Sequence, residues 1–524
     1  MALVRRIATV GGYTGISRVL GFVRDILIAH IVGAGPVADA FIVAFRLPNM
    51  FRRIFAEGAF NAAFVPLFAR RLEQESEAAA KLFAEEALSV LLFTLFGLTA
   101  LAMVAMPWLV HVLAPGFAAE PEKFALTVEL SRITFPYLLF MSLTALLSGL
   151  LNSLHRFAAA AAAPILLNIL FIVGLLVVLP FTGFPGHVMS WAVAVAGVAQ
   201  LVLLMVAAGR AGVWLRPRRP RLTPGVKRLL KLMVPGLLSA GVLQINILVG
   251  TAIASSAAGA VSYLYYADRV YQLPLGLIGI AFGVVLLPDL SRKLRAGADS
   301  AAMATLNRGL ELAMLLTLPA AVALMVIPAP IVIVLFERGA LSREGSEAIA
   351  LALAAFASGL PAFVLVKILQ PGFFAREDTV TPLKMAAVSV VANVGLSLTL
   401  FPVMGHVGIA LATALAAWLN TLLLALGLRR REFLRLDPRL RGRMPRIFAA
   451  ALAMGGGIWW LAQRLAPWFD GDLLERVAGL CLLVVVGLFI FAALALGLGA
   501  VRRSELTEVL RRPKAPPAEG GKPT

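Results

Sequence analysis

Charged side chains are concentrated in residues 18–57, inside a stretch that is otherwise apolar enough to cross a membrane twice. The stretch contains Arg18, Arg24, Arg46, Arg52, Arg53, Asp25, Asp39 and Glu57. A charge at bilayer depth costs roughly 2.5–3.5 kcal/mol, so such residues almost always face a bundle interior or a water-filled cavity. Internal ion pairing, such as Arg18–Asp25 or Arg53–Glu57, is an alternative for any single residue. Because three acids cannot neutralise five arginines, the set predicts a cationic cavity that holds an anion.

Helical spacing places these residues on shared faces of two consecutive helices. At 100° per residue, Thr14, Arg18 and Asp25 lie close to one stripe, and Ser17 and Arg24 share a neighbouring one. In the next helix Asp39, Arg46, Arg53 and Glu57 fall close to one face, with Asn49 and Arg52 beside it. Whether Arg46 and Arg53 bind the anion or pair with Asp39 and Glu57 stays open.

A second polar segment, SYLYYADRVYQLPLG at 262–276, carries Asp268 and Arg269. In a helix, Ser262, Tyr265, Arg269 and Gln272 can share a face. The aromatic run is compatible with an interfacial belt, whereas tyrosine and arginine together can also bind a sugar or phosphate. Arginine suits an anion site because its planar guanidinium can donate two parallel hydrogen bonds to a phosphate and stays charged.

Signals for catalysis or metal binding are scarce. The five histidines are separated and show no ligand spacing, and no Walker A sequence is present. The single cysteine, Cys481, excludes disulfides and cysteine-based metal sites. We expect the Glu85–Glu86 pair to be a solvated helix end rather than an acid/base dyad. We therefore expect no catalytic residues, no metal and no cofactor.

The composition is that of a membrane protein. Of 524 residues, 60% are hydrophobic and 14% charged, and the mean hydropathy is +0.91. Long, nearly uncharged runs recur throughout, which predicts an all-α polytopic membrane protein rather than a β-barrel. The net charge of +19 is divided among short loops, which fits an anionic membrane surface and disfavours nucleic-acid binding.

Fourteen segments are long enough to span a bilayer. They lie at about 8–33, 37–69, 79–110, 123–151, 157–181, 186–210, 224–253, 259–290, 300–335, 345–374, 379–402, 406–428, 444–466 and 473–501. Loops after even-numbered segments are rich in arginine, and loops after odd-numbered segments have few cations and several acids. This asymmetry predicts that both termini are cytoplasmic.

The chain repeats itself in the same order. Pro136 and Asn168 recur as Pro361 and Asn393, each 225 residues later, and a Gly-His-Val at 186–188 recurs at 405–407. We therefore predict an N-lobe at 1–210, a basic cytoplasmic linker at 211–223, a C-lobe at 224–430, two extra helices at 431–503 and a disordered cytoplasmic tail at 504–524. Parallel repeats predict a pseudo-two-fold axis along the membrane normal and a central cavity.

The segments SRVLGFVRD, ADAFIVAFRLPNMFRRIFAEGAFNAAFVP and YYADRVYQLPLG resemble signatures of the MurJ/MviN family of lipid II flippases. This family belongs to the multidrug/oligosaccharidyl-lipid/polysaccharide exporter superfamily. The resemblance covers nearly the whole chain. It implies a flippase in the bacterial cytoplasmic (inner) membrane that moves lipid II, undecaprenyl-pyrophosphate-MurNAc-pentapeptide-GlcNAc, to the outer leaflet by alternating access. The partners it implies are lipid II, membrane lipids and the peptidoglycan synthesis machinery, with no nucleic acid.

The resemblance also implies roles for individual residues. Essential cavity arginines match Arg18, Arg24, Arg52 and Arg269, while Asp39 and Glu57 match charged positions and Asp25 matches a gating partner. Together with the helical faces, this gives Arg18, Arg24, Arg52, Arg269, Asn49 and Arg53 as substrate-binding candidates. The gating or charge-partner candidates are Asp25, Asp39, Glu57, Ser17 and Asp268. The two extra helices would form a groove for the lipid tail.

Three alternatives stay open. Another polyprenyl-pyrophosphate-linked oligosaccharide needs the same arginines. A multidrug exporter for cations would favour acids in its cavity, and a membrane glycosyltransferase would need a catalytic carboxylate or a large outward domain. For energy coupling, the seventh, eleventh and twelfth segments supply polarity through Gln244, Asn246, Asn393, Ser397 and Thr413, but no buried acid apart from Asp378 at a helix start. This favours coupling to membrane potential, at roughly 2.3 kcal/mol per charge per 100 mV, over sodium coupling.

Overall fold

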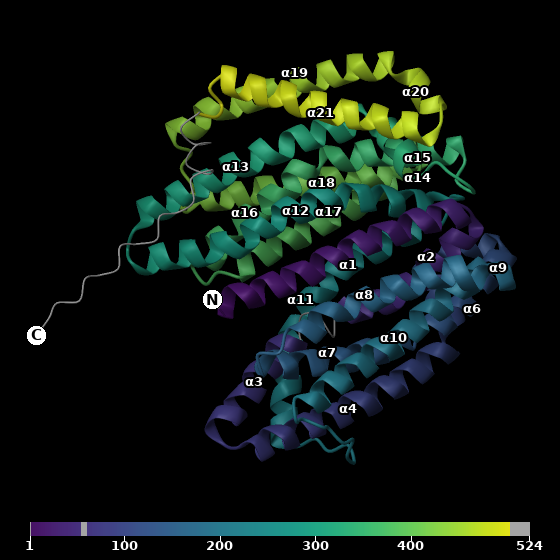
Figure 1. Cartoon of the computed structure of the whole chain (residues 1–524). Coiled ribbons are helices and arrows are strands. Elements are labelled where there is room, and N and C mark those ends of the chain that lie inside the picture. Colours follow the sequence, from purple (N-terminus) through teal and green to yellow (C-terminus); the bar gives the residue numbers. More distant parts are fainter. Residues whose placement is uncertain (1, 54–59, 503–524) are drawn as a thin grey trace, which may run out of the picture. The chain divides into compact units, whose positions relative to one another are not determined.

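The computed structural model describes residues 2–53 and 60–502, which form helices and their connections (Figure 1). The elements are α1 (Ala2–Val32), α2 (Pro36–Arg52), α3 (Asn61–Gln74), α4 (Glu77–Val104), α5 (Met106–Leu113), η2 (Pro115–Ala119), α6 (Pro121–Thr134), α7 (Tyr137–Ser153), α8 (Ala158–Val173), η3 (Gly174–Val178), α9 (Leu179–Thr182), α10 (Pro185–Arg210), α11 (Pro224–Ala254), α12 (Ala260–Arg295), α13 (Asp299–Val326), α14 (Pro328–Phe336), α15 (Arg343–Ser358), α16 (Leu360–Phe374), α17 (Val380–Met404), α18 (His406–Arg430), α19 (Pro438–Arg464), α20 (Ala466–Asp470) and α21 (Leu473–Gly497). The all-α prediction is confirmed.

Each predicted apolar segment, as far as its residues are described, coincides with one of these helices or with consecutive ones; residues 54–59 of the segment at 37–69 lie outside the described residues. The segment at 406–428 is α18, and the segment at 123–151 is α6 followed by α7. Within the described residues, nine helices or helix pairs are long and apolar enough to cross a membrane. The chain is therefore a multi-pass membrane protein, while the count of fourteen spans stays a prediction.

Two of the helix breaks occur at the repeated proline. Pro136 lies between α6 and α7, and Pro361 is the second residue of α16, directly after α15. Proline has no N–H to donate to the preceding turn, and it disfavours helical geometry in the residue before it. The same sequence feature therefore interrupts a helix at two positions 225 residues apart.

The helices group into two compact units, which are described separately. The first unit comprises residues up to Gln272 together with Ile331–Phe356 and Leu383–Asn420. Within it α10 packs against α7 and α8, and α1 packs against α8 (Figure 1). Buried phenylalanines from α3 and α4, including Phe64 and Phe83 with ring centroids 5.7 Å apart, stack in its core. This packing holds α1 and α2 beside the other helices of the unit.

The second unit comprises Leu273–Pro330, Ala357–Pro382 and the residues from Thr421 onward. Here α19 and α21 lie side by side, and α19 packs on α13 (Figure 1). Buried Glu311 on α13 accepts hydrogen bonds from Arg443, from Arg439 at 3.2 Å and from Arg308. Because a buried carboxylate needs such donors, this ionic cluster specifies where α19 docks on α13.

The segment between α10 and α11 is held against α4. The backbone N–H groups of Arg216 and Arg218 donate to Glu85 Oε1 at 3.2 Å and Ser89 Oγ at 2.7 Å, and Arg218 Nε donates to Glu85 Oε2 at 2.6 Å. Thr223 Oγ1 donates to Glu86 Oε2 at 2.7 Å. The expected solvated helix end is wrong for Glu85, which is buried and accepts hydrogen bonds from Arg216 and Arg218 of this segment.

Candidate functional site

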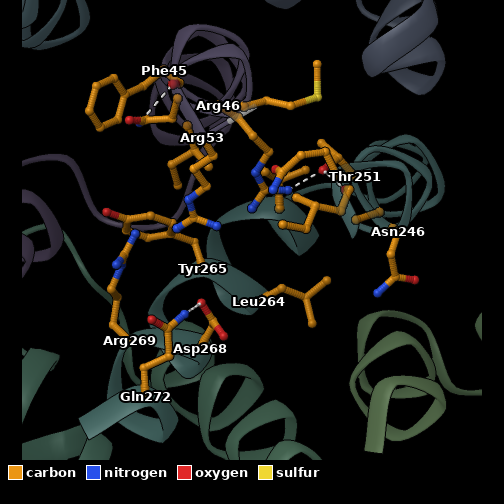
Figure 2. Close-up of a pocket in the computed structure, with 18 of the residues that line it drawn as sticks. Phe45, Arg46, Arg53, Asn246, Thr251, Leu264, Tyr265, Asp268, Arg269 and Gln272 are labelled. Atoms are coloured by element: carbon orange, nitrogen blue, oxygen red, sulfur yellow. Dashed lines mark hydrogen bonds between the residues drawn. The ribbon is translucent and has the colours of Figure 1, made fainter. Parts of the chain in front are cut away.

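A cavity of about 430 Å³ lies within the first unit. Its polar lining comes from α1, α2, α11, α12, α17 and α18 and consists of Arg24, Arg46, Asn49, Arg52, Arg53, Gln244, Asn246, Thr251, Tyr265, Asp268, Arg269, Gln272, Asn393 and Thr413. Figure 2 shows Arg46, Arg53 and Arg269 extending into this space from two different helices. The predicted cationic cavity therefore exists within one compact unit.

Asp25 on α1 contacts side chains from both α1 and α12. Its Oδ1 accepts hydrogen bonds from Arg24 Nε at 3.1 Å, Arg24 Nη2 at 2.8 Å and the Tyr265 hydroxyl at 3.0 Å. Arg269 Nε lies 3.5 Å from Asp25 Oδ2, and the Arg269 guanidinium sits over the Tyr265 ring at 4.6 Å. Two arginines thus share one buried carboxylate, which agrees with a charge-partner role for Asp25.

Asn168 on α8 fixes the other side of Arg24. Its Oδ1 accepts from Arg24 Nη1 at 3.1 Å, while its Nδ2 donates to the Ser17 carbonyl at 2.9 Å. The Arg24 guanidinium also lies over the Phe171 ring at 5.2 Å. Arg24 is 7% exposed, so its orientation is set by partners on two helices before any ligand arrives.

The arginines of α2 have different local partners. Arg46 donates to Thr251 Oγ1 on α11, and Arg52 Nε donates to Asn49 Oδ1 at 3.3 Å. Asn49 Nδ2 in turn donates to the Phe45 carbonyl one turn earlier at 3.0 Å. These bonds are to neutral groups, so the positive charge of this wall is not cancelled by them.

The charge of the cavity wall is strongly positive. Five arginines line it, and among the described lining residues Asp268 is the single acid, hydrogen-bonded to Gln272 one turn further along α12. Arg269 Nε is buried and makes no hydrogen bond within the described part of the chain. A wall lined by several guanidinium groups can bind a phosphate or another multivalent oxyanion.

Asp39 lies apart from this cavity and joins other helices. Its Oδ2 accepts from Lys123 Nζ at 3.0 Å and Gly259 N at 3.1 Å, and its Oδ1 accepts from Ser262 N at 2.9 Å and Ser262 Oγ at 2.5 Å. A carboxylate from α2 thereby caps the first turn of α12, where orphan N–H groups and the helix dipole favour an anion. Arg46 and Arg53 do not pair with Asp39, because its donors are these other groups.

Further hydrogen bonds join loops of the first unit near the start of α12. Ala340 N donates to the His30 carbonyl at 2.7 Å, Tyr266 donates to the Gly33 carbonyl at 2.9 Å, and Gly116 N donates to Ser255 Oγ at 2.9 Å. Gly33 has φ of +70°, and the Ala340 carbonyl lies so near that a β-carbon has no room there. The loops joined here are those that the charge pattern predicts to face outward.

The other sequence candidates are more dispersed. Arg18 is exposed on α1 and is absent from the cavity lining, and Glu57 lies outside the described residues. Ser17 contributes to the site through Asn168 rather than directly. The substrate-binding and gating roles stay predictions for the whole candidate set.

Sequence reasoning missed the partners that come from distant segments. Lys123 was indistinguishable from an ordinary loop cation, although it is 4% exposed and bound to Asp39. Asn168 could be noticed only as a repeated residue, and its contact with Arg24 spans 144 positions. Within the described residues no group of three or more His, Cys, Asp or Glu side chains could hold a metal ion.

Comparison with known proteins gives consistent matches. The profile described as lipid II flippase MurJ matches residues 28–479. A Rhizobium tropici protein named probable lipid II flippase MurJ is 47% identical, over 100% of this chain and 99% of its own. A Burkholderia cenocepacia protein named lipid II flippase MurJ is 38% identical, over 95% of this chain and 97% of its own.

The fold also matches solved structures. A lipid II flippase MurJ in an inward closed conformation has a TM-score of 0.78 at 22% identity, over 96% of this chain and 99% of its own. An inward-facing multidrug resistance transporter of the MATE family has a TM-score of 0.67 at 16% identity, over 79% of this chain and 94% of its own. These likenesses concern the fold.

Proposed function

The chain belongs to the lipid II flippase MurJ family, and we propose that it moves lipid II from the cytoplasmic to the outer leaflet for peptidoglycan synthesis. It is a membrane transporter and not a catalytic enzyme. The observation that carries the proposal is the arginine-rich wall of the cavity, which is lined by Arg24, Arg46, Arg52, Arg53 and Arg269, with Asp268 as the acid among the described lining residues and Asp25 bound to Arg24 and Arg269.

A lipid-linked pyrophosphate needs such a wall. The anion loses its hydration when it leaves water, and burial of an unpaired charge is costly. Guanidinium groups replace the lost hydrogen bonds, and their planar fork matches the oxygens of a phosphate. Arg24 and Arg269 come from α1 and α12, so a bound pyrophosphate would bridge two helices.

Asp25 gives the site a means of release. Its Oδ1 accepts from Arg24, and its Oδ2 lies 3.5 Å from Arg269 Nε. A pyrophosphate that binds these arginines competes with Asp25 for them. When Asp25 pairs with the arginines again, release of the lipid is favoured. A ligand shifts a conformational equilibrium only by its differential affinity for the two states. If Asp25 pairs with the arginines in the outward state, the affinity for lipid is lower there, and this supplies the difference.

The rival functions are less well supported. A cation exporter would place acids where this cavity has five arginines. Another polyprenyl-pyrophosphate-linked oligosaccharide would use the same arginines, so the identity of the sugars has to be tested directly. We place the protein in the bacterial cytoplasmic membrane with both termini in the cytoplasm, where it would deliver lipid II to the peptidoglycan synthesis machinery.

The proposal is tested by depleting the protein in cells and measuring the lipid II that an impermeant probe reaches at the outer leaflet. We expect accessible lipid II to fall while total lipid II is maintained or rises. Re-expression of the wild-type chain should restore access. Unchanged accessibility after depletion would defeat the proposal.

A further inference from the structure

The cavity wall contributed by α11, α17 and α18 is neutral and polar, in contrast to the arginine wall. It consists of Gln244, Asn246 and Thr251 on α11, Asn393 on α17 and Thr413 on α18. In the view of Figure 2, Asn246 lies on the opposite side of the cavity from Arg269. A single cavity therefore presents two chemically different walls.

Two of these residues already form a pair. Asn393 Nδ2 donates to Asn246 Oδ1 at 2.6 Å, and Asn393 Oδ1 accepts from Ser397 Oγ at 3.5 Å. An amide side chain has two N–H donors and two acceptor lone pairs. Within the described part of the chain the amide nitrogen of Asn246 has no acceptor, so hydrogen-bonding capacity remains at the cavity surface.

Gln244 also has unused hydrogen-bonding capacity at the cavity surface. It lines the cavity with 9% of its surface exposed and has no hydrogen-bond partner among the described residues. An amide at a cavity surface with no partner among the described residues can donate and accept hydrogen bonds with a ligand. A ligand hydroxyl or carbonyl group would satisfy it.

The two walls meet at a defined point. Arg46 on the cationic wall donates to Thr251 Oγ1 on the neutral wall. Thr251 donates its own proton to the Ile247 carbonyl at 2.6 Å, and Thr413 donates to the Ile409 carbonyl at 2.9 Å. The two threonine hydroxyls therefore act toward a ligand as acceptors, beside amides that donate.

We propose that Gln244, Asn246 and Asn393 form a sugar subsite, which binds hydroxyl and acetamido groups of the sugar next to the pyrophosphate. This inference rests on the proposed function, because it assigns the neutral wall to the headgroup of the same lipid. Neutral amides have no charge with which to bind a phosphate strongly, but they match the mixed donors and acceptors of a sugar. The subsite would make the protein selective for a sugar-bearing lipid.

The test compares two ligands on purified protein in lipid nanodiscs: lipid II, and undecaprenyl pyrophosphate, which has no sugar. Gln244→Leu and Asn246→Ala should each weaken lipid II binding about tenfold, as expected for one lost hydrogen bond to a buried group. Binding of undecaprenyl pyrophosphate should change less than about twofold, and its retention shows that each variant is folded. The matched control is Ser389→Ala, since Ser389 lies on α17 but donates to the Ala416 carbonyl at 2.6 Å.

The outcomes separate this inference from the proposed function. If the wild-type protein binds neither lipid, the proposed function fails. If it binds both and the two variants weaken both equally, or weaken neither, the sugar subsite is wrong. Neutral oxygens could instead hold a sodium ion, so each titration is repeated with sodium replaced by choline. A loss of lipid II binding that appears only with sodium present would overturn the sugar assignment.

Discussion

At the scale of single residues, the site is organised before substrate arrives. Arg24 is held by Asp25 and Asn168, and Arg269 by Asp25 and the Tyr265 ring. Pre-positioned donors do not need to be ordered when a ligand binds, which reduces the entropic cost of binding. The same contacts mean that substrate must displace a carboxylate that is already present.

Arg24→Ala should reduce lipid II transport about tenfold or more, while membrane insertion stays intact. Arg24→Lys should be nearly as defective, because one ammonium cannot reproduce the bonds to both Asp25 and Asn168. Transport is measured in proteoliposomes, and Arg70→Ala is the control, since Arg70 is exposed and, among the described residues, bonds to Gln74 one turn away. Normal translocation by Arg24→Ala would contradict a binding role.

Asp25→Asn should separate affinity from turnover. Without the carboxylate charge, Arg24 and Arg269 are freer to bind pyrophosphate, so the dissociation constant of undecaprenyl pyrophosphate should fall by several-fold. Transport of lipid II should nevertheless slow, because the competitor that favours release is weakened. Binding and flipping are measured on the same preparation. A parallel loss of affinity and rate would argue that Asp25 only orders the arginines.

At the scale of helices, long-range side-chain caps determine where elements meet. Asp39, on α2, caps the first turn of α12, and Glu85, on α4, binds the segment that precedes α11. The apolar runs were enough to predict the helices, since their length and hydropathy are properties of the sequence itself. The caps were not predictable, because Asp39 and Lys123 are 84 residues apart and nothing local to either indicates the other.

Asp39→Asn should lower the apparent Tm of the purified protein clearly. Lys123 is buried, and removing one partner of a buried ion pair costs about 3–5 kcal/mol. Glu120→Gln is the matched control, because Glu120 lies 3.5 Å from the same ammonium but is half exposed, where an ion pair contributes only about 0–1 kcal/mol. Partial recovery in Asp39→Asn combined with Lys123→Met would show that the buried charge is the cause. Equal Tm values for the two single variants would exclude this cap as a stabilising contact.

The connection between α16 and α17 should have a measurable pH dependence. Hydrogen bonds from Thr381, with Arg431 nearby, lower the pKa of Asp378 from 3.8 to about 2. A carboxyl whose pKa is lower in the folded state stabilises the fold above pH about 4, and this contribution is lost as the pH falls towards 2. The difference in Tm between the wild type and Asp378→Asn should therefore be constant above pH 4 and shrink below it. A difference independent of pH down to 2 would refute the assignment.

At the scale of the whole molecule, the arrangement of charge along the chain predicts its orientation. The basic loops follow even-numbered segments, and the net charge of +19 is concentrated in them. Sequence was sufficient here because the positive-inside rule acts on loops one at a time. It was insufficient for the cavity, whose neutral wall depends on bringing Asn246 and Asn393 together across 147 positions.

Orientation can be tested with reporter cysteines. Cys481 is the single cysteine of the chain, so Cys481→Ser gives a cysteine-free background. In that background Phe184→Cys, in a predicted outward loop, should react with an impermeant maleimide in intact cells. Ala296→Cys, in a predicted cytoplasmic loop, should react only after the membrane is permeabilised. The reverse pattern would invert the topology.

The first turns of α12 carry two of the contacts described above. Ser262 donates hydrogen bonds to Asp39, and Arg269, seven positions further along α12 and about 10 Å along the helix axis, contacts Asp25. A helix of that length is rigid. A displacement of Arg269 by a bound pyrophosphate would therefore also translate or rotate Ser262. A cap built from several short hydrogen bonds tolerates little of either movement before it detaches. Binding in the cavity at Arg269 would then be coupled, through α12 itself, to breakage of the Asp39–Ser262 contacts at the N-terminal end of this helix.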